Sequence, residues 1–201
     1  PDLCVFDLDP SRDDPKELRA AALAVRALLD ELGLPSWLKT SGSKGFHLVV
    51  PLDGEAAFDS VYEFTGAVGA VLVRRNPELL TQEFSKADRG GRILVDTGRN
   101  GFGATFAAAY AVRPKPGAPV SAPCTWQELE SGNVVPRTFT LRTMAARIAD
   151  VGDLWADVHE HGRSLRAPLK QVRALLTDEE WSEAEAAKRR RPKARKSRNR
   201  A

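Results

Sequence analysis

The stretch LCVFDLDP at residues 3–10 is an apolar run that ends in two acids and a proline. The run predicts a buried strand, and because side chains on a strand alternate between its faces, Asp7 and Asp9 point the same way. Pro10 has no N–H to donate, so it ends the strand just after the second acid. The sequence therefore predicts a pair of carboxylates at the carboxyl end of a strand, where open α/β sheets bind their ligands.

Four interpretations of this stretch compete. In the plainest one, the acids form a turn and cap the next helix, because Asp is frequent in both places. An EF-hand loop starting at Asp7 is excluded, since its sixth position would be Arg12 instead of Gly and its twelfth Leu18 instead of Glu. The other two are a phosphohydrolase of the haloacid dehalogenase type, with Asp7 as nucleophile, and a two-metal nucleotidyltransferase.

Composition indicates one globular core followed by a basic tail. The chain has 201 residues, of which 42% are hydrophobic and 28% charged. Its net charge is +3, yet residues 188–200 alone carry nine Lys or Arg and no acid, so the rest carries −6. Such a run is expected to be disordered, and it favours either nucleic-acid contact or a solvated linker. We expect a folded core at residues 1–160, then a helical linker and a disordered basic tail at residues 161–201.

The ends and the cysteines point to a cytoplasmic piece of a longer protein. The chain begins at Pro1, directly before a core strand. No signal peptide is visible, and no apolar run is long enough to predict a membrane span. Cys4 in a strand and Cys124 in a loop form neither a disulfide framework nor a metal-ligand spacing, which suits a reducing compartment.

The turn Ser-Gly-Ser-Lys-Gly at residues 41–45 joins two predicted strands, at residues 37–40 and 46–52. Its glycines permit positive φ and close backbone approach, while Ser41 and Lys44 add a hydroxyl and a charge, as in phosphate-binding nests. An ordinary Gly-rich hairpin is an equally open explanation, and a Walker A loop is excluded because a strand follows. His47, just inside the second strand, is either structural or a triphosphate contact.

The remaining pattern predicts packing helices at residues 15–32, 56–75 and 141–151, the last with Met144 and Ile148 facing inward, and a short helical turn at residues 126–129. Residues 81–91 are expected to form a basic loop. Further strands are predicted at residues 92–96 and 106–112.

Asp96 ends the strand predicted at residues 92–96, as Asp7 and Asp9 end the first one. Two acids at one strand end and a third at another are what two divalent ions need to bridge a nucleotide's phosphates and a 3′-hydroxyl. Arg99, in a glycine-rich loop at residues 97–105, and Arg113, after the strand predicted at residues 106–112, supply positive charge for phosphates. Solvated or salt-bridged arginines are the alternative explanation.

These segments together resemble the polymerase domain of bacterial DNA ligase D, in the archaeo-eukaryotic primase superfamily, which serves non-homologous end joining. The resemblance rests on residues 6–10, 38–47, 95–105, 110–121, 126–129 and 138–141, in family order, within roughly residues 3 to 150. It implies an α+β fold with a mixed, largely antiparallel sheet and packing helices, here without the family's N-terminal part. Residues 1–160 would be the primase-polymerase catalytic core.

The resemblance also implies site residues, cofactors and partners. The metal ligands would be Asp7, Asp9 and Asp96; the nucleotide ligands Ser41, Lys44, His47, Arg99 and Arg113; and the template contact or site organiser Arg89. Two Mn²⁺ or Mg²⁺ ions are the implied cofactors. The implied partners are DNA ends or primer-template, nucleoside triphosphates, a ligase module and a Ku-type end-binding protein, in the bacterial cytoplasm near the nucleoid and away from membranes.

The implied activity is DNA-dependent addition of ribo- or deoxynucleotides at DNA ends or gaps. Three departures bear on it: Ser43 stands where Gly is frequent, Thr97-Gly98 replaces a bulkier pair, and the upstream segment that carries 5′-phosphate and template contacts precedes this sequence in the family. The phosphohydrolase alternative gains from the acidic motif at residues 152–157, but it needs Gly where Pro10 stands. A non-catalytic module that binds DNA ends is the third function class.

Overall fold

A mixed six-stranded sheet forms the centre of the computed structural model, which describes residues 1–182. Its spatial order is β4-β5-β1-β3-β2-β6, and every neighbouring pair is antiparallel except the parallel pair β4 and β5. The strands are β1 (Leu3–Asp9), β2 (Trp37–Thr40), β3 (Phe46–Pro51), β4 (Leu80–Thr81), β5 (Ile93–Asp96) and β6 (Pro123–Cys124). The α+β class with a largely antiparallel sheet is confirmed.

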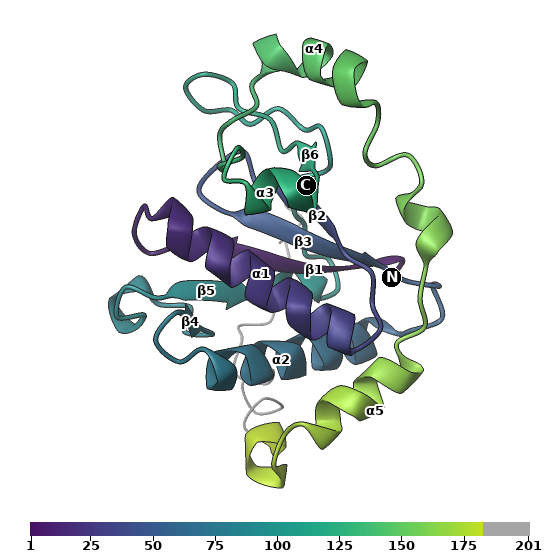
Figure 1. The fold of residues 1–201 in the computed structure, drawn as a ribbon. Coiled ribbons are helices and arrows are strands. Elements are labelled where there is room, and N and C mark those ends of the chain that lie inside the picture. The colour runs from purple at the N-terminus through teal and green to yellow at the C-terminus, as the bar shows by residue number, and fades with distance from the viewer. Residues whose placement is uncertain (183–201) are drawn as a thin grey trace, which may run out of the picture.

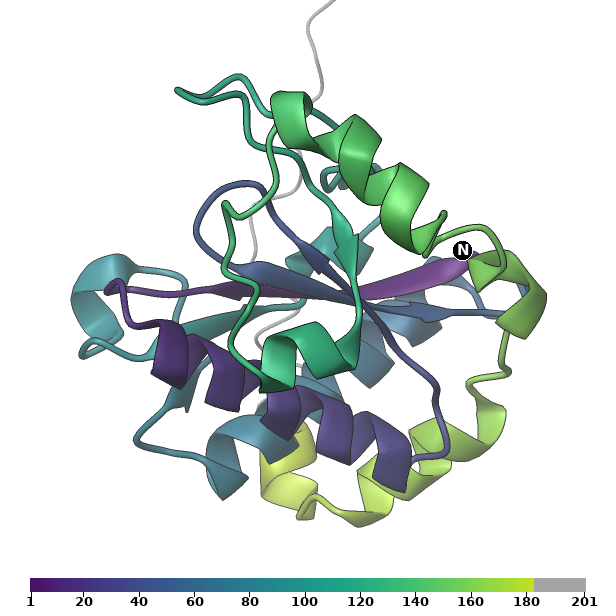
Figure 2. The ribbon, with the colours of Figure 1, turned by 45° about the horizontal axis from the view of Figure 1, so that its top comes forward.

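Two long helices cover one face of this sheet, as Figures 1 and 2 show. These two are α1 (Pro15–Glu31) and α2 (Phe58–Arg75). The shorter helices are α3 (Trp126–Glu130), α4 (Leu141–Val151) and α5 (Arg166–Ala174), and the 3-10 turns are η1 (Lys86–Asp88), η2 (Gly98–Asn100) and η3 (Val158–His161). The carboxylate of Asp14 caps α1 by accepting from the N–H groups of Lys16 and Glu17, as its sequence pattern predicts.

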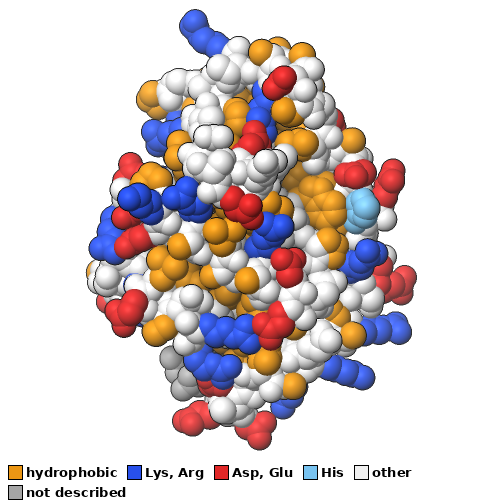
Figure 3. Space-filling view, in the orientation of Figure 1, with side chains coloured by type: hydrophobic (Ala, Val, Ile, Leu, Met, Phe, Trp, Pro, Cys, Tyr) orange, Lys and Arg blue, Asp and Glu red, His pale blue; other side chains and the backbone are white. Residues whose placement is uncertain are grey.

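The alternation of β1 decides which side chains face the helices. Cys4, Phe6 and Leu8 belong to the hydrophobic core against α1 and α2. Asp7 and Asp9 therefore point to the opposite face of the sheet, because side chains on a strand alternate. Viewed from the α1 side, acidic and basic side chains are interspersed over the surface (Figure 3), so this covered face shows no concentrated basic patch.

The strand predicted at residues 106–112 is wrong. Only Val112 makes an isolated bridge there, to Val120. Tyr110 adopts φ +63°, a left-handed conformation that a strand cannot contain. The segment still runs beside residues 119–121, because the Tyr110 N–H donates to the Ser121 carbonyl and the Arg113 N–H to the Pro119 carbonyl.

The inward face of α4 also differs from its prediction. Met144 is buried as expected, but Ile148 is 41% exposed. Arg147 takes the inward place instead, since its guanidinium pairs with Glu128 at 2.7 Å and lies 4.0 Å from the ring centroid of Phe139. Charged side chains are rarely buried unless they are paired, and Arg147 meets this condition through Glu128.

Residues beyond the boundary predicted at residue 160 pack on the core. Leu165, Val172 and Trp181 belong to the main hydrophobic cluster, and Arg74 of α2 pairs with Glu180 at 2.8 Å. The boundary itself stays a prediction, and the basic run at residues 188–200 lies outside the described residues. Across residues 1–182, none of the helices has the length and apolar character needed to traverse a bilayer.

Candidate active site

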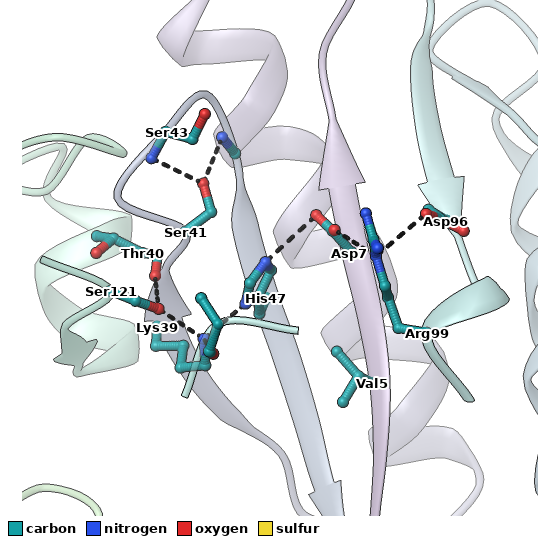
Figure 4. A network of polar contacts seen from close by, with 12 residues as sticks. Val5, Asp7, Lys39, Thr40, Ser41, Ser43, His47, Asp96, Arg99 and Ser121 are labelled. Atoms are coloured by element: carbon teal, nitrogen blue, oxygen red, sulfur yellow. Dashed lines mark hydrogen bonds and ion pairs between the residues drawn. The ribbon is translucent and has the colours of Figure 1, made fainter. Parts of the chain in front are cut away.

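One row of side chains crosses four strands on the face away from α1 and α2. The register pairs Lys39 of β2 with His47 of β3, His47 with Asp7 of β1, and Asp7 with Asp96 of β5. Directly opposed residues on neighbouring strands lie about 4.5–5.5 Å apart, so the row brings together groups that are distant in sequence. Figure 4 shows His47 between Lys39 and Asp7, with Asp96 beyond.

The three acids of the site are held by two arginines. Arg99 Nε lies 3.4 Å from Asp7 Oδ2 and 3.4 Å from Asp96 Oδ2, so one guanidinium bridges two carboxylates (Figure 4). Asp9, on the same face as Asp7, pairs through Oδ2 with Arg89 Nη1 at 3.0 Å. The two pairs differ in exposure, because the Arg99 side chain is 44% exposed and that of Arg89 only 3%.

A side-chain amide extends the sheet and places Arg99. β5 ends at Asp96, opposite Asp7, and the next backbone groups of β1 in that direction belong to Val5. Asn100 completes them: its Oδ1 accepts from the Val5 N–H at 2.8 Å, and its Nδ2 donates to the Val5 carbonyl at 2.7 Å. Asp96 Oδ1 accepts from the Gly98 N–H at 2.8 Å, so the turn around Arg99 is anchored at both ends.

The turn at residues 41–45 is seated on β1. Ser41 Oγ accepts from the N–H groups of Ser43 and Gly45, at 3.2 and 3.1 Å, and Gly42 adopts φ +63°. A Cβ at Gly45 would lie 1.6 Å from the Leu8 carbonyl oxygen, so only glycine fits this approach. Both predicted properties of the turn are therefore present: Gly42 has the positive φ and lies close to the Val120 backbone, and Gly45 approaches β1.

Cations from later segments reach the same turn. Lys115 Nζ donates to Ser43 Oγ at 2.6 Å, and Arg137 Nε donates to the Ser43 carbonyl at 2.9 Å. The hydroxyl that distinguishes Ser43 from glycine is therefore the acceptor for Lys115. Arg113 packs its Cγ toward Gly42, and its buried Nε has no hydrogen-bond partner within residues 1–182.

Electrostatics keeps Asp7 ionised and His47 neutral. Burial raises the pKa of Asp7, but His47 and Arg99 outweigh it, so the net pKa lies below the ordinary value. Burial lowers the pKa of His47 in spite of the opposing charge of Asp7. Because His47 is then neutral near pH 7, we attribute the ionisation of Asp7 mainly to the guanidinium of Arg99. His47 Nε2 lies 3.5 Å from Asp7 Oδ1.

All the residues predicted for the site line one cavity of about 650 Å³. They are Asp7, Asp9, Asp96, Ser41, Lys44, His47, Arg99, Arg113 and Arg89. Arg89 is buried and, besides Asp9, binds the carbonyl oxygens of Glu83 and Phe84, which is the geometry of a site organiser. The cavity is lined by three acidic and five basic side chains, since Lys86 adds to the four predicted cations.

Sequence reasoning missed three residues of this region. Phe84 and Phe106 line the cavity, and Lys39 lies buried beneath His47. The sequence could have pointed to Lys39 through its position: it is a lysine inside the short strand predicted at residues 37–40, directly before the turn at residues 41–45. Phe84 is a lone aromatic in an otherwise polar loop.

The acidic motif at residues 152–157 does not line the cavity. Asp153 instead accepts from the Tyr110 hydroxyl at 2.5 Å and from the Trp155 N–H at 2.8 Å. A phosphohydrolase of the haloacid dehalogenase type needs its distal acids beside the nucleophile. That alternative is therefore not supported.

The donor chemistry of the cavity fits divalent cations of the hard type. Carboxylate oxygens are the ligands that Mg²⁺ and Mn²⁺ prefer. Within the described chain, no group of three or more His, Cys, Asp or Glu side chains already stands in a metal-ligand arrangement. The three acids are instead paired with the guanidinium groups of Arg99 and Arg89.

Residues 1–155 match the family model described as LigD, primase-polymerase domain. The chain belongs to this family. It is 41% identical over 174 residues to the multifunctional non-homologous end joining protein LigD of Pseudomonas aeruginosa, and 33% identical over 173 residues to the bifunctional LigD of Bacillus subtilis. These matches cover 85% and 84% of this chain but 21% and 28% of the relatives, so the LigD domain here spans a minor part of their length.

A solved structure shares the fold of this LigD domain. It is the polymerase domain from Mycobacterium tuberculosis ligase D in complex with DNA, with a TM-score of 0.74 and 34% identity. The match covers 80% of this chain and 55% of that one. The predicted family resemblance and fold are therefore confirmed.

Proposed function

We propose that this domain is a DNA-dependent nucleotidyltransferase, a primase-polymerase that adds ribo- or deoxynucleotides at DNA ends or gaps during end-joining repair. One observation supports this most: the strand register sets Asp96 directly opposite Asp7, with Asp9 on the same face and the turn at residues 41–45 in the same cavity. Membership of the LigD primase-polymerase family and the likeness to a polymerase domain in complex with DNA support the substrate class.

Asp7, Asp9 and Asp96 are the residues that would hold two Mn²⁺ or Mg²⁺ ions. Such ions, when bound, stabilise charge on the phosphates and lower the pKa of an attacking 3′-hydroxyl. For the acids to serve as ligands, Arg99 must release Asp7 and Asp96. Its exposure allows this, and the released guanidinium then lies at the cavity where a phosphate can accept from it in bidentate fashion.

The other wall of the cavity offers donors for a triphosphate. The oxygen of Ser41 already accepts two N–H groups, so its own hydroxyl proton is available to a phosphate oxygen. Lys44 and Arg113 contribute charge, and the buried Nε of Arg113 is a donor awaiting an acceptor. His47, on the sheet beneath the cavity, adds a ring N–H. These residues bind the substrate and balance the charge that develops on it.

The partners proposed for the domain follow from this activity: a DNA end or primer-template, nucleoside triphosphates, a ligase module and a Ku-type end-binding protein. Template contact by Arg89 belongs to the same proposal, although its buried contacts support organisation of Asp9 more directly. A non-catalytic end-binding module is the weaker candidate, because it gives no reason for three carboxylates to share one cavity with five cations.

Primer extension tests the proposal in the longest natural protein that carries this sequence. In Mn²⁺, the double variant Asp7→Asn, Asp9→Asn should lose extension by at least about 10³-fold and remain folded, since neutral amides are poor ligands for hard cations. The matched control Asp13→Asn, Asp59→Asn removes two exposed carboxylates outside the cavity and should extend normally. Undiminished extension by the first variant, or release of phosphate from a simple phosphomonoester, contradicts the assignment.

A further inference from the structure

Lys39 is a charged side chain with no exposed surface, and the function proposed above does not use it. Burying an ammonium group is costly unless it is fully hydrogen-bonded. Lys39 Nζ meets that condition with three partners: His47 Nδ1 at 2.6 Å, the Ala107 carbonyl at 2.7 Å and Ser121 Oγ at 2.7 Å. Three acceptors arranged for one nitrogen indicate a built position for a cation.

The proton count at this nitrogen determines the state of His47. An ammonium group has three N–H donors and no acceptor. The Ala107 carbonyl can only accept, and Ser121 spends its hydroxyl proton on the Thr40 carbonyl at 2.8 Å, so its oxygen also accepts from Lys39. His47 Nδ1 is then the third acceptor. It carries no proton, and the proton of the neutral ring sits on Nε2.

We propose that Lys39 is a positioning residue, which holds the imidazole of His47 in the tautomer and orientation that aim Nε2–H at Asp7 and at a bound triphosphate. The triphosphate part of this inference rests on the proposed function; the tautomer part does not. With the opposite tautomer, a lone pair on Nε2 would face the carboxylate of Asp7, and two acceptors would repel each other.

Lys39 acts through His47 because an aromatic ring separates it from the cavity. Its Nζ lies 5.3 Å from the ring centroid of Phe106, and that ring meets His47 edge-on at 5.9 Å between centroids. Phe106 itself lines the cavity, whereas Lys39 does not. A ligand in the cavity therefore meets His47 and Phe106, with Lys39 one layer beneath them.

Charged and titratable groups of both signs face the ammonium group of Lys39. Burial lowers the pKa of Lys39 to about 7, and the carboxylate of Asp7 on β1 opposes this shift. Arg113, in the segment before β6, disfavours the charge, while the thiol of Cys124 on β6 also faces the group. Only the ammonium form has an N–H donor for each of the three neighbouring atoms, and this form is the one that fixes His47.

The test is the ¹⁵N spectrum of the His47 ring in the free protein, with His47→Gln used to assign its signals. In the wild type, the ring should be protonated on Nε2 only; protonation on Nδ1 overturns the proposal without any variant. In Lys39→Met, which keeps the length of the side chain but loses its donors, Nδ1 protonation should appear. Lys170→Met, which makes the same substitution at an exposed lysine of α5 outside the cavity lining, should leave the ring unchanged.

Kinetics adds a second arm that separates this inference from the proposed function. Lys39→Met should raise KM for the nucleoside triphosphate about tenfold with a smaller change in kcat, and should add little in a His47→Gln background. Equal losses with and without His47 contradict positioning. If the wild type extends no primer while the tautomer still depends on Lys39, the proposed function fails and the positioning role stands.

Discussion

The sheet that forms the floor of the cavity and the loops that form its rim are held in different ways. On the floor, His47, Asp7 and Asp96 continue a cross-strand row that begins at the buried Lys39, placed by backbone hydrogen bonds of the sheet. On the rim, Arg99 and its neighbours are held by side-chain contacts from loops, several of them exposed. A row set by register cannot shift by one residue without turning every side chain away. The rim, in contrast, can exchange its partners when a ligand arrives.

The largest effect is expected where the rim's backbone touches the floor. Gly45→Ala sets a Cβ against the Leu8 carbonyl, so the turn must separate from β1 at a cost of about 3 kcal/mol. Urea unfolding measures this loss. Gly66→Ala is the matched control, because its helical site in α2 has nothing within 4 Å of the added Cβ, and it should stabilise by about 0.5–1 kcal/mol. Equal stability of the two variants would show that the close contact between Gly45 and the Leu8 carbonyl does not restrict residue 45 to glycine.

Asn100→Ala should be the next most damaging change. It leaves the buried N–H and carbonyl of Val5 without their partners, at a cost of about 2 kcal/mol in the free energy of unfolding. Chemical denaturation checks this value, with the exposed Asn133→Ala as control. A loss below about 0.5 kcal/mol would mean that water replaces the amide easily.

The pH dependence of stability tests the floor in isolation. Because the pKa of His47 is lowered in the folded state, the unfolded chain binds its proton first as the pH falls below 6.5. Its contribution is therefore present above pH 6.5 and is lost progressively as the pH falls below that value. His47→Gln should flatten the stability profile in this window, measured by denaturation in chelator. An unchanged slope in the variant would show that other groups produce it.

Arg99→Gln should affect binding more than stability. Because Arg99 is 44% exposed, its removal should cost only about 1 kcal/mol in the free energy of unfolding, yet it frees Asp7 and Asp96 from a competitor. Without nucleotide, Mn²⁺ should bind severalfold more tightly to the variant; with nucleotide, affinity for the triphosphate should fall. Calorimetric titration gives both values. A change of the same sign in both titrations speaks against exchange at the rim.

Ser43→Gly should have the smallest effect. It removes the acceptor of Lys115 but leaves the carbonyl that binds Arg137, so stability should change by about 0.3 kcal/mol and the KM for nucleotide by no more than about twofold. Lys115→Met should give a similar change, and the double variant should add nothing further. A tenfold rise in KM would contradict this prediction and show that Ser43 contributes strongly to nucleotide binding.

The floor is also the part that the sequence predicts better. Alternation in residues 3–10 and 46–52 predicts that Asp7 and His47 share the non-core face, and the two strands have nearly the expected bounds. What alternation cannot show is which strands are neighbours, so the opposition of Asp7 and Asp96 is a property of register alone. Lys39 was missed for the same reason, because its acceptors come from Ala107 and Ser121, far along the chain.

The rim is less predictable because tertiary contacts set it. Residues 106–112 are apolar enough to predict a strand, yet Tyr110 turns into the left-handed region, where its hydroxyl meets Asp153. Arg113 reaches the cavity by that irregular path. The pairing of Arg99 with two acids likewise depends on Asn100, whose polar side chain reads in sequence as an ordinary loop residue.

The two outermost strands, β4 and β6, are only two residues long each, and β6 begins with Pro123. Edge strands this short, one of them lacking the N–H of Pro123, offer few backbone groups with which a second polypeptide could pair as an added strand. We therefore expect concentrated solutions of the domain to resist amyloid-like stacking, and any self-association to run through side chains instead of main-chain ladders.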